Sequence, residues 1–182
     1  MKTQETKARS EQEFRRVFSE WCGGDSRGVE LMRALMASAR LLEVLADHRL
    51  QKVGLSVPRL ALMASLRVEE RRGNPEGISP SELSQYQHIS KNTVSSLLAS
   101  LEDDGLIERV LCSEDKRSFK IRLTRVGRNR VSSALPKHGA FAVSAFASLT
   151  GEEQKTLLKL LQKLRSSLKS QVSGREFGSY KT

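Results

Sequence analysis

Residues 78–127 constrain the fold most, because within them an apolar pattern of helical spacing gives way to one of strand spacing. The first helix-start signal is a capping box at Ser79, with a proline in the first turn and Glu82 three residues after the cap. The second is at Ser90, and the apolar residues after it recur at i, i+3, i+4 and i+7: Val94, Leu97, Leu98 and Leu101. Gly105 is expected to end this second helix. The pattern predicts two short helices joined by a tight turn.

The outer face of the second predicted helix is short-chained, polar and nearly without carboxylates in its first half. The residues on this face are Lys91, Asn92, Thr93, Ser95 and Ser96. A helix that enters the major groove of DNA needs such a face, with polar groups for base edges and phosphates. An ordinary amphipathic surface helix with a polar outer side has the same pattern. The helix alone therefore leaves both interpretations open.

A pair of predicted strands follows, over residues 106–112 and 118–124. The second alternates apolar Phe119, Ile121 and Leu123 with polar residues, which is typical of a strand with one buried face. The loop between the strands, residues 113–117, ends in two cations. A basic hairpin tip beside a recognition helix can lie along a phosphate backbone or reach into a minor groove.

The run Asp115-Lys116-Arg117, followed by Leu123-Thr124 and Gly127, resembles the wing signature of the multiple-antibiotic-resistance repressor (MarR) family. The order of helices, wing and long final helices matches this family from Leu31 to Lys169. Its members are dimeric bacterial winged-helix transcription regulators, so the resemblance implies a regulator of that kind.

The resemblance also implies roles for the wing residues. Arg117 would insert into the minor groove and Asp115 would brace it, while we expect Lys116 to hold a phosphate. The chain departs from the family in the turn between the two short helices. Members usually have an apolar residue and then glycine there, whereas this chain has Gln87 and His88. Histidine tolerates the left-handed backbone region better than most residues.

The helices that flank this unit are predicted to pair two subunits. The helix over residues 29–52 carries a wide apolar set, as a helix buried on two sides requires. Near the other end, leucines recur at i, i+4, i+7 and i+11: Leu157, Leu161, Leu164 and Leu168. This repeat indicates a dimerisation element, and packing within one subunit is the alternative.

These patterns predict a mainly α fold with a small β-wing, in which a winged helix-turn-helix is embedded in an intertwined helical homodimer. The expected division comprises an N-terminal extension with a short amphipathic helix (1–28), a dimerisation helix (29–54), a winged helix-turn-helix DNA-binding domain (55–123), C-terminal dimerisation helices (124–172) and a tail (173–182). The helix in the extension is predicted from the apolar residues Phe14, Val17, Phe18 and Trp21.

Composition narrows the classes of function. The net charge of +10 favours a polyanionic partner, either nucleic acid or an anionic membrane surface. No apolar run reaches the roughly 18 residues of a membrane span, and two cysteines do not make a disulfide framework, so we expect a cytoplasmic protein. The common catalytic and phosphate-binding motifs are absent from the sequence, and we expect no enzyme activity, metal or cofactor.

The expected function is that of a sequence-specific transcription regulator, with double-stranded DNA and a second copy of the chain as partners and no membrane. The resemblance implies a repressor that a small phenolic or anionic ligand releases from DNA, although activation is equally compatible. Met36, Arg40 and Met63 are the candidate ligand contacts. Core packing for the methionines and solvent exposure for the arginine are the alternatives. A winged-helix protein-interaction module and a non-specific DNA-binding protein also remain open.

Overall fold

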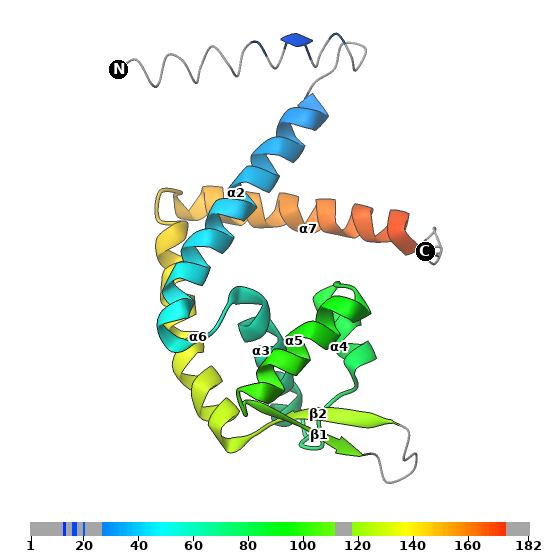
Figure 1. The fold of residues 1–182 in the computed structure, drawn as a ribbon. Helices are drawn as coiled ribbons and strands as arrows, with labels where there is room; N and C mark the ends of the chain where they lie inside the picture. The colour runs from blue at the N-terminus through cyan, green and yellow to red at the C-terminus, as the bar shows by residue number, and fades with distance from the viewer. Residues whose placement is uncertain (1–12, 14–15, 18–19, 21–26, 112–117, 174–182) are drawn as a thin grey trace.

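The computed structural model of the chain describes residues 13, 16–17, 20, 27–111 and 118–173 (Figure 1). Most of the predicted N-terminal amphipathic helix, including Phe14, Phe18 and Trp21, therefore lies outside the described residues. The same holds for both cysteines and for the predicted wing tip at 113–117.

The chain is mainly helical with one two-stranded sheet, which confirms the predicted fold class. Its elements are α2 (Arg27–Leu50), the short 3-10 helix η1 (Gln51–Val53), α3 (Val57–Arg71), α4 (Pro80–Gln87), α5 (Lys91–Asp103), β1 (Ile107–Leu111), β2 (Phe119–Leu123), α6 (Arg125–Ala145) and α7 (Gly151–Ser173). Among the described residues no helix is both long and apolar enough to cross a membrane.

The predicted helix starts and stops are confirmed. The Ser79 hydroxyl accepts from the Glu82 N–H, and the Glu82 carboxylate accepts from the Ser79 N–H at 2.7 Å. The Ser90 hydroxyl accepts from the Thr93 N–H at 3.1 Å and so caps α5. Gly105 follows α5 with a φ of 66°, in the left-handed region that favours glycine. These caps are local, which is why the sequence predicts them well.

The turn between α4 and α5 accommodates the departure at Gln87 and His88. His88 has a φ of 53° and takes the left-handed position itself. The Gln87 side chain donates to the Ser65 hydroxyl at 2.7 Å and to the Ala61 carbonyl at 3.3 Å, both on α3. At the position where the family usually has an apolar residue, a hydrogen-bonding side chain thus ties the turn to α3.

The wing is an antiparallel pair in which Ile107 faces Leu123 and Leu111 faces Phe119. An isolated bridge between Ile78 and Ile121 attaches the segment before α4 to β2. Gly77 has a φ of 91°, and a Cβ there would lie 1.9 Å from the Ile121 carbonyl oxygen. This close approach of two backbones connects the wing to the helical part.

The hydrophobic core lies between α3, α4, α5, the wing and the first half of α6. Its fully buried side chains include Leu62, Met63, Leu66, Leu83, Val94, Leu98, Leu101, Ile121, Leu123 and Val131. Met63 is thus a core residue of the winged unit.

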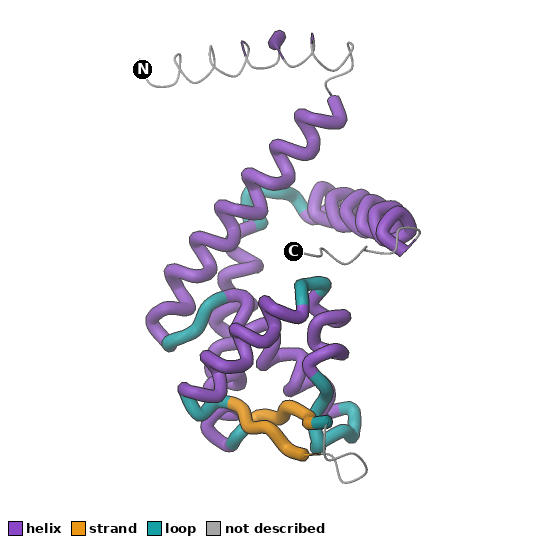
Figure 2. The backbone as a smooth tube through the Cα atoms, turned by 45° about the vertical axis from the view of Figure 1, so that its right-hand side comes forward, coloured by secondary structure: helices purple, strands orange, loops and turns teal. Residues whose placement is uncertain are grey.

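By contrast, α2 and α7 present large apolar side chains on their surfaces. They lie together on one side of the winged unit in two views (Figures 1 and 2). Exposed apolar residues on these helices include Leu31, Met32, Met36, Leu41, Val44, Leu45, Leu158, Leu160, Leu164 and Leu168. Over residues 151–171, where burial is described, α7 has no buried residue, and Leu157 is half-buried. One subunit thus leaves most of the leucine repeat uncovered, and its role as a dimerisation element stays a prediction.

Candidate nucleic-acid interface

The first half of α5 presents its polar side chains outward. Val94, Leu98 and Leu101 are buried beneath the helix. The five residues predicted to face the major groove are all exposed: Lys91, Asn92, Thr93, Ser95 and Ser96. The same periodicity that anchors α5 in the core therefore leaves a short polar strip on its outer side.

The hydroxyl groups of this strip are already oriented by the helix. The Ser95 hydroxyl donates to the Lys91 carbonyl at 2.9 Å, and the Ser96 hydroxyl donates to the Asn92 carbonyl at 3.1 Å. A hydroxyl that donates inward keeps lone pairs for an outside donor. Ser95 and Ser96 are thus set to accept hydrogen bonds, whereas the Asn92 amide can both donate and accept and Lys91 can only donate.

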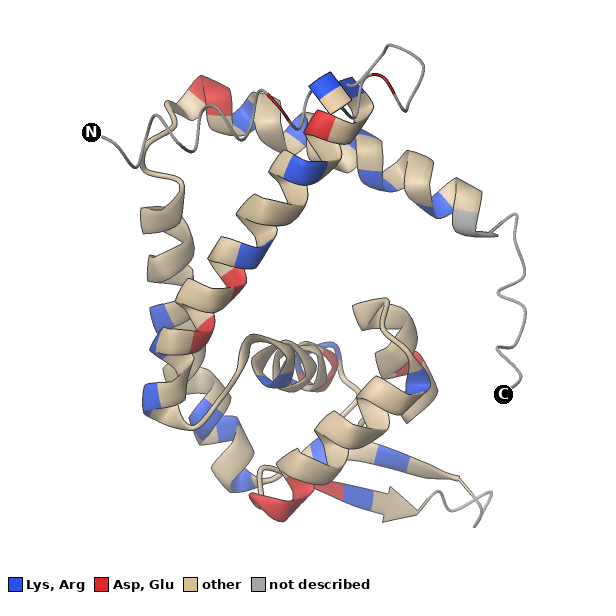
Figure 3. Cartoon of the chain, turned by 45° about the horizontal axis from the view of Figure 1, so that its top comes forward, with Lys and Arg blue, Asp and Glu red and all other residues tan. Residues whose placement is uncertain are grey.

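Carboxylates near α5 are placed at its far end or are held by partners. Glu102 accepts from Arg109 Nε at 2.8 Å, and Asp104 is paired with Arg59. Glu82, near the start of α4, is occupied in the capping box. In Figure 3 the red segments near α5 gather where it meets β1. The first half of α5 is consequently open to an anionic partner.

The described part of the wing holds its cations in ion pairs. Lys120 lies 3.0 Å from the Glu76 carboxylate, and Arg122 Nε donates to Glu108 at 2.7 Å. The predicted DNA contacts Asp115, Lys116 and Arg117 lie outside the described residues. Of the described wing residues, Phe119 starts β2 and Leu123 ends it beside α6.

Contacts at the base of the wing fix its direction relative to α5. The Thr124 hydroxyl donates to the Gly105 carbonyl at 2.7 Å, and the Thr124 N–H donates to the Leu106 carbonyl at 3.1 Å. The Thr124 hydroxyl also accepts from the Gly127 N–H at 3.0 Å and caps α6. One threonine thus joins the end of α5, the start of the wing and the first turn of α6.

An ion-pair cluster that the sequence analysis missed joins α3 to α6. The Glu70 side chain is only 8% exposed and accepts from Arg67 at 2.8 Å and from Arg128 at 2.8 Å. Glu70 and Arg128 are 58 positions apart. No local pattern in the sequence indicates such a pairing, although Arg67 and Glu70 at i, i+3 were visible as a helix-surface pair.

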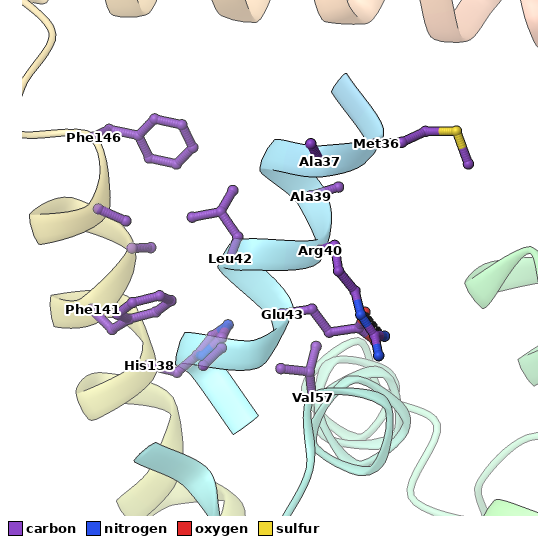
Figure 4. Close-up of a pocket in the computed structure, with 13 residues that line it drawn as sticks. Met36, Ala37, Ala39, Arg40, Leu42, Glu43, Val57, His138, Phe141 and Phe146 are labelled. Carbon is purple, nitrogen blue, oxygen red and sulfur yellow. Dashed lines mark hydrogen bonds and ion pairs between the residues drawn. The ribbon is translucent and has the colours of Figure 1, made fainter. Parts of the chain in front are cut away.

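A second candidate site is a cavity of about 940 Å³ between α2 and α6 (Figure 4). His138 and Phe141 of α6 and its C-cap residue Phe146 point toward α2, whereas Met36 and Arg40 line the cavity from α2 and point away from α6 in this view. Arg40 Nη1 donates to the Glu43 carboxylate at 3.3 Å. Two of the three candidate ligand contacts therefore share one cavity. Met63 does not line it, because a fully buried position in the winged core takes its side chain elsewhere.

Comparison with known proteins gives the family. The sequence profile described as the MarR family matches residues 69–118, from the end of α3 into the wing. The regulator PecS of Dickeya dadantii, named an HTH-type transcriptional regulator, is 30% identical over 128 residues, which cover 70% of this chain and 75% of PecS. The chain belongs to the MarR family.

Two further matches cover a similar share of this chain. The repressor YetL of Bacillus subtilis is 28% identical over 138 residues, covering 75% of this chain and 80% of YetL. Among solved structures, the MarR family regulator Sco3205 of Streptomyces coelicolor, in complex with DNA, matches with a TM-score of 0.70 and 28% identity. That match covers 79% of this chain and 89% of Sco3205. The predicted resemblance is confirmed, and the 138 residues matched to YetL are more than the winged unit alone contains.

Proposed function

We propose that this MarR-family chain is a sequence-specific DNA-binding transcription regulator of the cytoplasm, and that it represses by occupying an operator as a homodimer. The observation that carries the proposal is the exposed polar first half of α5, presented by a buried apolar face and open to an anion. The DNA complex of Sco3205 and the repressor name of YetL support it. No catalytic role is part of this proposal.

Base reading is assigned to α5. The Asn92 amide can form two hydrogen bonds with an adenine edge, and Lys91 can donate to guanine or to a phosphate. Ser95 and Ser96, whose hydroxyls donate back to the helix, accept best from the amino groups of cytosine or adenine. Thr93 shares a 2.8 Å hydrogen bond with Ser90 and adds a methyl group to the interface.

The wing is assigned to the flanking minor groove. In this proposal Arg117 enters the groove, Asp115 braces it and Lys116 holds a phosphate, as the family resemblance implies. The pairing of Lys120 and Arg122 with carboxylates supports this division, because these two strand cations are already engaged within the subunit.

Dimerisation is assigned to residues 29–54 and 124–172, which flank the DNA-binding domain at 55–123. The exposed leucines of α2 and α7 support this division, because one subunit leaves them uncovered. A two-fold symmetric dimer reads two half-sites about one helical turn apart, roughly 10 base pairs.

Ligand control is assigned to the cavity between α2 and α6. Its walls are mostly apolar, with Arg40, Glu43 and His138 as polar groups, so a small phenolic molecule fits its chemistry. A phenol hydroxyl can donate to Glu43, whereas a carboxylate would have to draw Arg40 away from Glu43. Release follows if the ligand binds a form of the dimer that does not fit the operator.

Fluorescence anisotropy with DNA from upstream of the chain's own gene tests the proposal, against a scrambled duplex. Asn92→Ala should weaken binding to the specific duplex by about 1–3 kcal/mol and leave the scrambled duplex unchanged. Lys91→Ala should weaken both, and affinity should fall steeply with salt because phosphates are contacted. Lys159→Ala on α7 is the matched control and should change neither.

Failure to bind any duplex would favour the second class of function, a protein-interaction module. Equal, salt-sensitive binding of both duplexes would leave a non-specific DNA-binding protein. A preference of about a thousandfold or more is typical of a specific regulator.

A further inference from the structure

A cationic groove runs along the junction between the end of α2 and the first half of α6. It consists of two adjoining cavities of about 280 and 650 Å³, which share Lys52 and Val53. The cations that line them are Arg49, Lys52, Arg125, Arg130 and Lys137. No Asp or Glu is among the described residues that line either cavity. In Figure 3 the blue segments gather along this part of α6 and the end of α2.

The polar groups on the α6 side recur every four residues. Arg125, Asn129 and Ser133 line the larger cavity, and Lys137 lines the smaller one. Four residues are slightly more than one helical turn, so these side chains form a gently winding strip about 18 Å long. Hydrogen-bond donors and positive charges are therefore spread along the groove instead of meeting at one point.

Several of these cations have no carboxylate partner. Among the described residues none is recorded within ion-pair distance of Lys52, Arg125 or Lys137. Arg130 donates to the Val53 carbonyl, and Arg49 lies 5.1 Å from the centre of the Phe141 ring. Like charges gathered without counter-charges repel one another, and a bound anion removes that cost.

We propose that this groove binds a small polyphosphate anion, either inorganic or carried by a phosphorylated metabolite. Several phosphates in a row match cations spread along a strip, whereas a single carboxylate would meet only one or two of them. Asn129 and Ser133 add donors for phosphate oxygens. The floor of the smaller cavity is apolar, with Leu50, Ala134 and Phe141 buried, and it suits the uncharged body of a metabolite.

The groove adjoins the ligand cavity, since its smaller part shares Ala46, His138 and Phe141 with it, but it differs from the exposed apolar face of α2 and from the polar face of α5. It takes the last turn of α2 and η1, whereas the exposed apolar residues of α2 lie earlier, from Leu31 to Leu45. It begins beside the base of the wing, at the end of β2 that leads into α6. Because it borders the link from α2 to α3, an occupant would bridge the dimerisation helix and α6.

Isothermal titration calorimetry tests the proposal by measuring the affinity of the full chain for sodium tripolyphosphate at a fixed salt concentration. The double variant Lys52→Ala/Arg125→Ala should bind at least about tenfold more weakly, since two charge-assisted contacts are lost. Both side chains are exposed, so the thermal unfolding midpoint should not fall. The control Lys159→Ala/Lys163→Ala removes two exposed cations of α7 and should bind as the wild type does.

If the groove variant (Lys52→Ala/Arg125→Ala) and the α7 variant (Lys159→Ala/Lys163→Ala) bound tripolyphosphate equally weakly, general electrostatic attraction would explain the binding and the proposal would be overturned. No binding of tripolyphosphate or ATP to the wild type would also overturn it. Tighter binding of ATP than of tripolyphosphate supports the site with a metabolite as its source, and equal binding supports the site with inorganic polyphosphate.

DNA binding by the same variants separates this site from the DNA interface. The groove variant should bind the specific duplex as the wild type does. Lys91→Ala should weaken DNA binding and retain tripolyphosphate binding. If the groove variant lost affinity for both tripolyphosphate and the specific duplex, the groove would be part of the DNA interface and the proposal would be overturned. If the wild type bound tripolyphosphate but no specific duplex, only the proposed DNA-binding function would be refuted.

Discussion

Gly127 lies in the first turn of α6, where its backbone touches the base of the wing. A Cβ at this position would lie 1.9 Å from the Leu106 carbonyl oxygen and 2.9 Å from the Leu106 carbonyl carbon. Real Cβ atoms essentially never come closer than 3.0 Å to such a neighbour. Gly127→Ala therefore requires α6 and the wing base to separate by at least about 1 Å, because both partners are backbone.

The cost follows from the contacts that this separation breaks. Two hydrogen bonds cross the junction, from the Thr124 N–H to Leu106 and from the Thr124 hydroxyl to Gly105, and each contributes about 1 kcal/mol. Loosened packing around the fully buried Leu123 and Val131 costs a further ~1–2 kcal/mol. Alanine returns about 1 kcal/mol of helix propensity. The expected destabilisation is roughly 2–3 kcal/mol.

Gly139→Ala is the matched control in the same helix. Nothing lies within 4 Å of a Cβ at Gly139, and the position is in the interior of α6. The substitution should therefore stabilise the chain by about 0.5–1 kcal/mol, because it restricts the unfolded chain without a clash.

Urea denaturation followed by circular dichroism measures both changes. Protein concentration must be held constant, because the stability of a homodimer depends on it. Opposite signs for the two alanines are the expected result. If Gly127→Ala were as stable as the wild type, or if both variants shifted in the same direction, the argument from the wing–helix contact would be refuted.

Three further predictions address the caps and the exposed apolar face. Leu164→Glu on the exposed face of α7 should dissociate the homodimer in analytical ultracentrifugation while the helical signal persists, and a variant that stays dimeric would contradict the assigned interface. Thr150 and Glu153 form a capping box at the start of α7, in which the Glu153 N–H donates to the Thr150 hydroxyl and the Glu153 carboxylate accepts from the Thr150 N–H and hydroxyl. These two donors lower the pKa of Glu153, so the box stabilises α7 above the unfolded-state pKa, and the stabilisation is lost as pH falls through the folded-state value. Helicity of α7 should therefore decrease in acid in the wild type and depend less on pH in Glu153→Gln, as circular dichroism can test. Ser79→Ala should destabilise the winged unit by about 1 kcal/mol in urea, whereas the exposed Ser81→Ala should cost less; equal effects would argue against the cap.

The features that could be predicted from the sequence are those that depend on residues only a few positions apart in the chain. The capping boxes at Ser79 and Thr150, the buried stripe beneath α5 and the exposed Asn92 follow from helical spacing alone. The strand alternation likewise predicted the pairing of β1 with β2. The departure at His88 was visible in the sequence, and its left-handed backbone agrees with what histidine tolerates.

Only the tertiary structure determines the contacts between residues that are far apart in the chain. Periodicity identifies Met63 as apolar but cannot distinguish a core position from a cavity wall, and the fold places it in the core. The Glu70–Arg128 pair and the polar anchor from Gln87 to Ser65 join helices that no local signal relates. The cationic groove likewise arises because η1 brings Lys52 beside α6. Spacing along a helix determines which face a residue occupies, whereas only the packing of helices against one another determines what that face meets.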